Sequence, residues 1–207
     1  MPLAPGTPAD SAAAMLAWMN ADDVELAKNA MLTALEPTTG APGWGNKAGT
    51  LHWTCRETCA HIAHDLIAYA TQLTSRSDDA YLPLDLVVRS DATAAQLVQI
   101  TAGCADLLCA ALRTAGPEAR AWHWGPTDPS GFAALGCNEI LLHTYDITSG
   151  LGVDWPLPDS LCAAVLARLF PDAPSGDPAQ TLLWCTGRIA LPNRPRLTSW
   201  TLRAAVG

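Results

Sequence analysis

The chain has 207 residues, about one to one and a half domain equivalents, so we expect one globular unit with a short appendage. Hydrophobic residues make up 49% of the chain and charged residues 15%, which excludes an intrinsically disordered protein. The net charge of -8 argues against nucleic-acid binding, because basic side chains provide most of that affinity.

The N-terminal run MPLAPGTPAD has neither the basic nor the apolar region of a signal peptide. No uninterrupted apolar run approaches the 18 or so residues of a membrane span. We therefore expect a cytoplasmic protein without a membrane partner. The seven cysteines include no Cys-x-x-Cys pair, and we interpret them as reduced, buried thiols.

Alanine and leucine dominate the chain and most apolar residues follow helical spacing, so we predict an all-α fold. The first predicted helix covers Asp10 to Leu35, with a break near Asn20, and Pro37 ends it. A long segment rich in Gly and Pro follows. We expect its Trp44 to fold back onto the rest of the protein.

The second predicted helix begins after Thr54, which forms a capping box with Glu57, and ends near Leu73. A connector with the strand-like run LDLVV leads to a third helix at about Thr93 to Thr114, and a Gly-Pro pair terminates it.

The fourth predicted helix has Asp128 as N-cap and Pro129 at its first position, and it ends near Ser149. Because it is apolar almost all round, we place it in the middle of a bundle. A short extra helix follows at about Pro158 to Phe170, and the tail TLLWCTGRIALPNRPRLTSW is predicted to be irregular or a small hairpin. We divide the chain into a helical bundle, residues 1–172, and a tail, residues 173–207, packed on it.

Three polar side chains interrupt the apolar fourth helix. Glu139, His143 and Asp146 are spaced by four and three residues and therefore share one face. A buried carboxylate without a partner is unfavourable and is forced to take up a proton. A metal ion is one partner that would stabilise it.

His61 on the second helix lies about 100° from the main apolar stripe and shares its flank with Asp65. Together with Glu139 and His143 it would complete a site of two imidazoles and one carboxylate, as in catalytic zinc centres built between facing helices. Alternatively, Glu139 and His143 form a structural hydrogen-bonded pair.

Other polar residues have open roles. Asp65 and Asp146 either orient the ligating imidazoles from behind or form surface salt bridges. We expect His64 to be solvated or to support the ligands, and His52 and His123 to be surface residues.

Two sequence runs carry a family resemblance. WTCRETCAHIAHDL, residues 53–66, resembles the W-[ST]-x-R-[DE]-x-x-x-H-[IL]-A segment of the DinB/YfiT-like superfamily, specifically its mycothiol-dependent maleylpyruvate isomerase N-terminal domain family. GFAALGCNEILLHTYDI, residues 131–147, resembles that family's E-x-x-x-H-x-x-D helix. The similarity extends over roughly residues 15–174.

The resemblance implies a DinB-like four-helix bundle with a divalent ion, often zinc, held by His61, Glu139 and His143, which would also be the catalytic residues. It further implies chemistry with mycothiol, an actinobacterial low-molecular-weight thiol. We interpret the protein as a metal-dependent thiol S-transferase or isomerase acting on a small electrophile. Trp53 and Arg188 are candidate substrate contacts, Arg188 as an anion-binding group.

Two alternatives remain for the function. One is a metal-dependent hydrolase or other thiol-independent enzyme on the same bundle, and the other is a non-catalytic bundle that binds a small molecule. Relatives with isomerase activity carry a further domain after the bundle, whereas about 35 residues follow Asp172 here, so we do not expect maleylpyruvate as the substrate. We expect a monomer or a homodimer.

Overall fold

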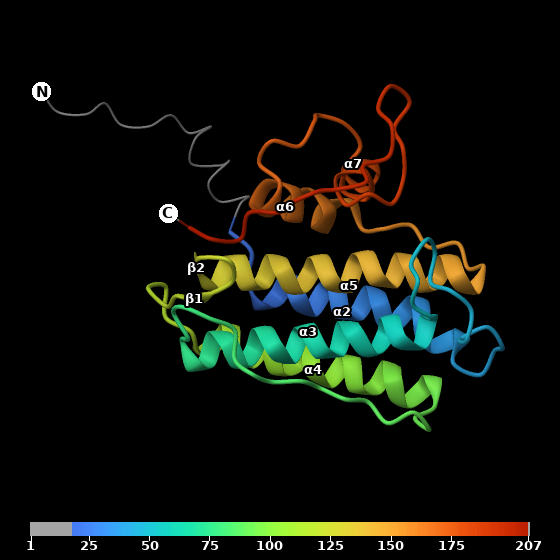
Figure 1. Cartoon of the computed structure of the whole chain (residues 1–207), viewed down its shortest axis with the longest axis horizontal. Helices are drawn as coiled ribbons and strands as arrows, with labels where there is room; N and C mark the ends of the chain where they lie inside the picture. Colours follow the sequence, from blue (N-terminus) through green and yellow to red (C-terminus); the bar gives the residue numbers. More distant parts are fainter. Residues whose placement is uncertain (1–17, 207) are drawn as a thin grey trace, which may run out of the picture.

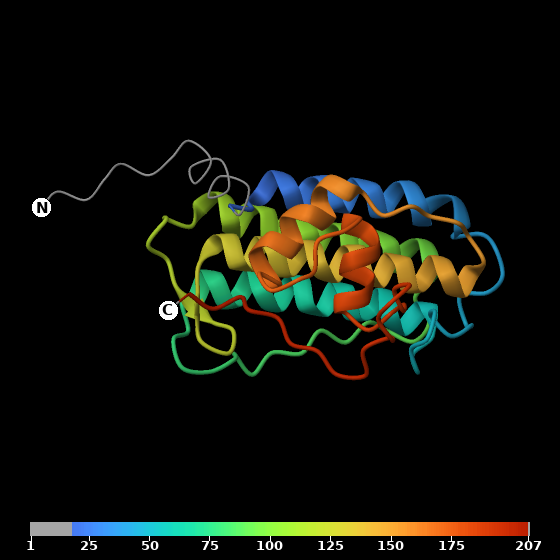
Figure 2. The ribbon, with the colours of Figure 1, turned by 90° about the horizontal axis from the view of Figure 1, so that it is seen from above.

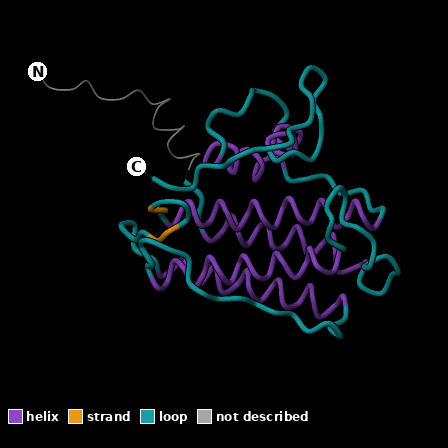
Figure 3. Tube along the Cα trace, in the orientation of Figure 1, coloured by secondary structure: helices purple, strands orange, loops and turns teal. Residues whose placement is uncertain are grey.

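The computed structural model describes residues 18–206 of the chain, and the helical prediction is confirmed there. The α-helices are α2 (Ala21–Leu35), α3 (Cys55–Ser75), α4 (Ala94–Thr114), α5 (Pro129–Leu151), α6 (Asp159–Leu169) and α7 (Pro178–Cys185). A 3-10 turn, η1 (Glu36–Thr38), follows α2. The strands β1 (Ala121–Trp122) and β2 (Pro126–Thr127) pair antiparallel at one end of the bundle, where Figure 3 draws them in orange.

The long helices α2, α3, α4 and α5 lie side by side as a four-helix bundle, and α6 and α7 cover the outer side of α5 (Figures 1 and 2). Helix α3 packs against α4 and α5, and α2 packs against the same two helices. Helix α5 is consequently buried on almost every side, as its apolar sequence predicts. This position matters because α5 carries three of the candidate site residues.

Capping side chains fix where the helices begin. Thr54 and Glu57 form the predicted capping box at the start of α3, and Asp128 accepts a hydrogen bond from the backbone N–H of Gly131 at the start of α5. Asn20 caps α2, which explains the break expected there, since an N-cap residue is not itself helical. The part of the predicted first helix before residue 18 lies outside the described residues.

The tail differs from its prediction in one respect. Its first part is not irregular but forms the helix α7, because Asp177 caps the backbone N–H of Gln180 and Pro178 occupies the first helical position. Beyond α7 the tail is irregular, apart from isolated bridges between Leu191 and Arg194 and between Ala205 and Thr127 of β2. The strand-like run at residues 84–88 forms no strand within the described chain.

The Gly-rich loop before α3 folds back as expected. Trp44 is buried, and its Nε1 donates a hydrogen bond to the carbonyl of Thr38 at 3.0 Å. The loop lies against the end of α5, where a Cβ on Gly150 would overlap the carbonyl oxygen of Lys47 and lie 2.7 Å from Sγ of Cys55. Only glycine permits this close approach.

One described helix, α4, is long and apolar enough to cross a membrane by length and composition alone. This is weak evidence for a membrane span, because its apolar residues pack against α3 and α2 within the bundle. All seven cysteines are free and buried, as predicted.

Candidate metal centre

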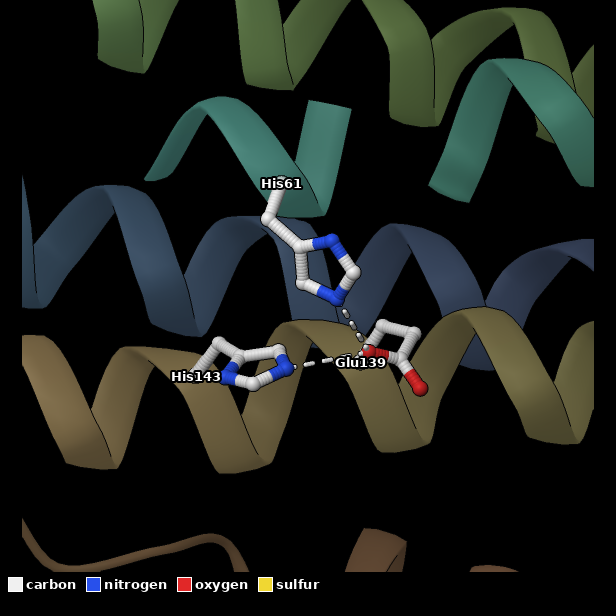
Figure 4. Close-up of side chains that lie close together, drawn as sticks. All are labelled: His61, Glu139 and His143. Atoms are coloured by element: carbon white, nitrogen blue, oxygen red, sulfur yellow. Dashed lines mark ion pairs between the residues drawn. The ribbon is translucent and has the colours of Figure 1, made fainter. Parts of the chain in front are cut away.

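Helices α3 and α5 bring three side chains together in the middle of the bundle. His61 points from α3 toward Glu139 and His143 of α5 (Figure 4). Oε2 of Glu139 lies 3.2 Å from Nε2 of His143 and 3.8 Å from Nε2 of His61. One ligand atom from each of the three residues lies within 4.8 Å of the others.

Asp146 holds the imidazole of His143 from the opposite side. Its Oδ2 lies 3.0 Å from Nδ1 of His143, while Nε2 of the same ring faces Glu139. A proton on Nδ1 satisfies this hydrogen bond and leaves Nε2 as the nitrogen that faces the site. The spacing of three and four residues along α5 produces both contacts, as the sequence predicts.

Arg188, from the tail, neutralises the buried carboxylate of Asp146. Its Nη2 donates to Oδ2 of Asp146 at 2.7 Å and its Nε donates to Oδ1 at 3.2 Å. Nη1 donates to the carbonyl of Thr186 at 3.1 Å. The side chain of Asp146 is only 1% exposed, so this two-contact ion pair supplies the charge partner that burial demands.

The electrostatics favour a charged pair between Glu139 and His143. Burial alone would lower the pKa of His143, but hydrogen bonds to Asp146 and Glu139 and their charges outweigh it and raise the pKa to about 9. Burial would raise the pKa of Glu139, yet the hydrogen bond from His143 and the nearby positive charges lower it. Burial lowers the pKa of His61, which favours the neutral imidazole that a metal requires.

Asp65 lies beside the ligand atoms rather than behind them. Its Oδ2 is 3.5 Å from Nε2 of His61, the same nitrogen that faces Glu139, and its Oδ1 is 2.9 Å from Nδ1 of His64. Burial and the neighbouring carboxylate of Glu139 raise the pKa of Asp65. Asp65 forms a second group of possible metal donors with His61 and His64, whereas Asp146 contacts only the imidazole of His143 among the three donors.

The donor set fits a small divalent cation. A tetrahedral zinc ion with ligand bonds of about 2.0–2.1 Å places its ligand atoms about 3.3 Å apart. The separations of 3.2 and 3.8 Å around Oε2 of Glu139 are near that value, and all three ligand atoms lie within 4.8 Å of one another. Two imidazoles and one carboxylate are also ligands that zinc accepts.

Trp53 covers the solvent side of the centre. Its ring lies 4.6 Å from that of His61 and 6.4 Å from that of His143, measured between centroids. It is 44% exposed, so one face contacts the imidazoles while the other meets solvent. A molecule that approaches the three donors from this side contacts the indole.

The two histidines expected on the surface differ from each other. His52 is exposed, but His123 is only 7% exposed, which corrects the prediction. It follows β1 in a tight turn and its ring packs between Tyr69 and Tyr81. The aromatic residues on either side of it in the sequence, Trp122 and Trp124, were the one signal that this loop is packed.

Comparison with known families identifies one match. Residues 30–148 match the family described as the Mycothiol maleylpyruvate isomerase N-terminal domain, which is part of the DinB-like superfamily. The chain belongs to this family. No curated protein and no solved structure matched.

The matched region of this DinB-like domain contains the three donors and Asp146. It excludes α6, α7 and Arg188, which lie after residue 148. The family therefore indicates a mycothiol-associated enzyme domain, and the tail that supplies the counter-ion of Asp146 lies outside the match.

Proposed function

We propose that this protein is a divalent-metal-dependent enzyme that uses a low-molecular-weight thiol such as mycothiol, transferring it to a small electrophile or isomerising the electrophile through an adduct. The observation that carries the proposal is the convergence of His61, Glu139 and His143 from two helices, with ligand atoms within 4.8 Å of one another. Membership in a mycothiol-associated family supports the choice of thiol.

In this proposal His61, Glu139 and His143 hold the metal, with zinc as the best match to the donors. When bound, the ion supplies Lewis acidity and lowers the pKa of a thiol that binds at its open position. Asp146 keeps Nε2 of His143 directed into the site, and Asp65 lies within reach of a proton released there. The bundle around α5 excludes bulk water from the buried side.

Trp53 and Arg188 were expected to contact substrate. The ring of Trp53 lies 4.6 Å from that of His61 and 6.4 Å from that of His143, which supports the proposal that it contacts substrate. Arg188 bonds to Asp146, which in turn contacts the imidazole of His143. Three N–H groups of Arg188 bond to Asp146 and Thr186. Its contact with an anionic substrate stays a prediction.

Metal analysis of the protein purified without chelator tests the centre. We expect close to one zinc per chain, and we expect His61→Ala to lose most of it. His52→Ala is the matched control, because His52 is exposed and outside the three donors. Protein that takes up no divalent metal after soaking, or a His61→Ala variant with full metal content, would contradict the centre.

Thiol use is tested separately with mycothiol and chlorodinitrobenzene. We expect metal-dependent S-conjugation, together with a rise in melting temperature on mycothiol addition that simple salts do not produce. A metal-loaded protein that ignores mycothiol and hydrolyses esters instead would favour the thiol-independent enzyme.

We also propose that residues 173–207 act as a tail packed on the bundle rather than as a separate domain. The backbone N–H of Arg203 bonds to the carbonyl of Leu169 at 2.8 Å, and Thr127 and Ala205 form an isolated bridge. Limited proteolysis is expected to leave the tail intact until the bundle unfolds. Early cleavage within residues 186–206 that leaves the bundle folded would refute this division.

A further inference from the structure

A cavity of about 450 Å³ opens next to the metal centre, and the three donors do not account for it. Asp65 and Glu139 are among its lining residues. Further lining residues come from α3, from the connector after it, from the turn between β1 and β2 and from the last segment of the tail. Figure 2 shows the connector and the last segment of the tail along the same flank of the bundle.

The cavity has a largely aromatic lining. It is lined by Tyr69, Tyr81, His123, Trp124 and Trp200. The ring of His123 packs edge-on against Tyr69 and Tyr81, at centroid distances of 5.7 and 5.8 Å respectively. It also packs at a tilt against the ring of Trp124, with the centroids 5.3 Å apart. Flat rings at such distances offer a surface on which another planar ring stacks well.

Trp124 contributes to this wall at a conformational cost. Its φ is +54°, a left-handed backbone conformation that bulky residues rarely adopt. Its side chain is nevertheless 67% exposed, so burial of the indole does not explain the strain. Strained residues of this kind cluster at ligand-binding sites, and here the strained backbone holds an indole at the cavity.

Most polar side chains in the lining already have partners. The amide nitrogen of Gln72 donates to the carbonyls of Ala80 and Trp122, and its oxygen accepts from the N–H of Leu82. The hydroxyl of Thr71 bonds to its own helix. A polyhydroxylated ligand, such as a sugar, would therefore lose hydrogen bonds to water without replacing them.

His123 is the exception. Among the described residues its Nδ1 is one of the buried side-chain atoms without a hydrogen-bond partner, and the residue lines the cavity. This nitrogen is itself covered by protein, so a ligand in the cavity meets the ring of His123 rather than Nδ1.

The lining offers an anion no arginine or lysine. Its acidic residues are Asp65 and Glu139, and none of the described lining residues is an arginine or a lysine. Burial lowers the pKa of His123, so that ring is neutral near pH 7. Arg188, the nearest arginine to the metal centre by its contacts, is held by Asp146 and does not line the cavity.

We propose that this cavity binds the electrophilic co-substrate and that this molecule is an uncharged, planar aromatic compound that stacks on the aromatic wall. The assignment to a co-substrate rests on the proposed thiol-dependent function. The ligand preference itself depends only on the cavity, so it can be measured without turnover.

Ligand-detected NMR titration of the full chain, with and without added zinc, tests the preference. The probes are 1,3-dinitrobenzene, its anionic counterpart 3,5-dinitrobenzoate, and methyl glucoside as a sugar. Without zinc we expect dinitrobenzene to bind about tenfold more tightly than the benzoate, because the cavity offers a carboxylate no arginine or lysine. With zinc the benzoate can also bind to the ion, so the preference of the cavity is read from the metal-free protein. We expect no binding of the glucoside.

A pair of variants locates the binding. Trp124→Gly removes the indole and tolerates the positive φ, and it should weaken dinitrobenzene binding about threefold to tenfold. Trp18→Gly is the matched control, because Trp18 is equally a solvent-exposed tryptophan but does not line the cavity. It should leave binding unchanged.

The outcomes separate this inference from the function on which it builds. Three results would each overturn the cavity assignment, even in an active transferase. They are tighter binding of the benzoate than of dinitrobenzene to the metal-free protein, binding of the glucoside in place of dinitrobenzene, and equal dinitrobenzene binding by the Trp124 variant and the parent. Selective dinitrobenzene binding by a protein that holds no metal or transfers no thiol refutes the proposed function and leaves the ligand preference of the cavity standing.

Discussion

The hydrogen bond between Asp146 and His143 gives the most direct test of how the centre is held. In Asp146→Asn the side chain keeps its shape but loses its charge, and the amide either donates toward His143 or turns away from it. Oδ2 of Asp146 is 3.0 Å from Nδ1 of His143 and 2.7 Å from Nη2 of Arg188, so one substitution perturbs both contacts.

Two magnitudes follow from these contacts. Loss of a carboxylate that orients a ligating histidine weakens metal binding by about 10- to 100-fold, or roughly 1.4–2.7 kcal/mol. Removal of one charge from a buried ion pair leaves the other uncompensated and lowers the free energy of unfolding by about 3–5 kcal/mol. We expect both effects in Asp146→Asn, the first by competition with a chromogenic chelator for zinc and the second by urea unfolding.

A second buried ion pair separates these effects. Asp128 and Arg168 also pair at 2.8 Å with both side chains buried, but neither contacts the metal donors. Asparagine at position 128 preserves a good N-cap for α5, so Asp128→Asn tests the ion pair alone. It should lower stability and leave zinc affinity unchanged. Zinc affinity within twofold of the parent in Asp146→Asn would refute the orienting role of Asp146.

Three further predictions follow from the fold. Gly150→Ala should lower the free energy of unfolding, measured with urea, by about 1–3 kcal/mol, because its Cβ would overlap a backbone carbonyl. Gly103→Ala, on the exposed side of α4, should raise the free energy of unfolding by up to about 1 kcal/mol in the same assay. Burial raises the pKa of Cys59 to about 11 and that of Cys162 to about 12. At pH 8 the native protein should therefore react slowly with a thiol reagent, whereas all seven thiols should react in the unfolded protein. A rapid reaction of the native protein would contradict the burial of the thiols. Thr54→Ala should destabilise the protein by about 1 kcal/mol through loss of the α3 cap, and an unchanged urea midpoint would show that the cap is dispensable.

The bundle could be predicted from sequence because its signals are local. The capping boxes, the N-cap Asp128 with Pro129 and the apolar stripes all act within a few residues, and the structure confirms the four long helices. The alignment of Glu139, His143 and Asp146 on α5 is equally local, since helical geometry alone places them on one face.

The parts that could not be predicted depend on contacts between distant residues. Arg188 meets Asp146 across 42 positions of sequence, and no spacing rule indicates where an irregular tail runs. The cavity beside Glu139 likewise combines the turn at His123 with the last segment of the tail. Helix α7, by contrast, could have been found, because Asp177 and Pro178 repeat the start signal that was recognised at Asp128 and Pro129.

The ion pair between Arg188 and Asp146 also has a consequence for the order of folding during synthesis. The ribosome completes α5 well before residue 188 emerges, so in the nascent bundle Asp146 has His143 but not yet Arg188 as a partner. Burial of this carboxylate, and with it the orientation of His143, is complete only after the tail has docked. The folding of the tail thereby acts as the final step in assembly of the site, and a chain stalled before residue 188 should present a bundle with a loosely ordered centre.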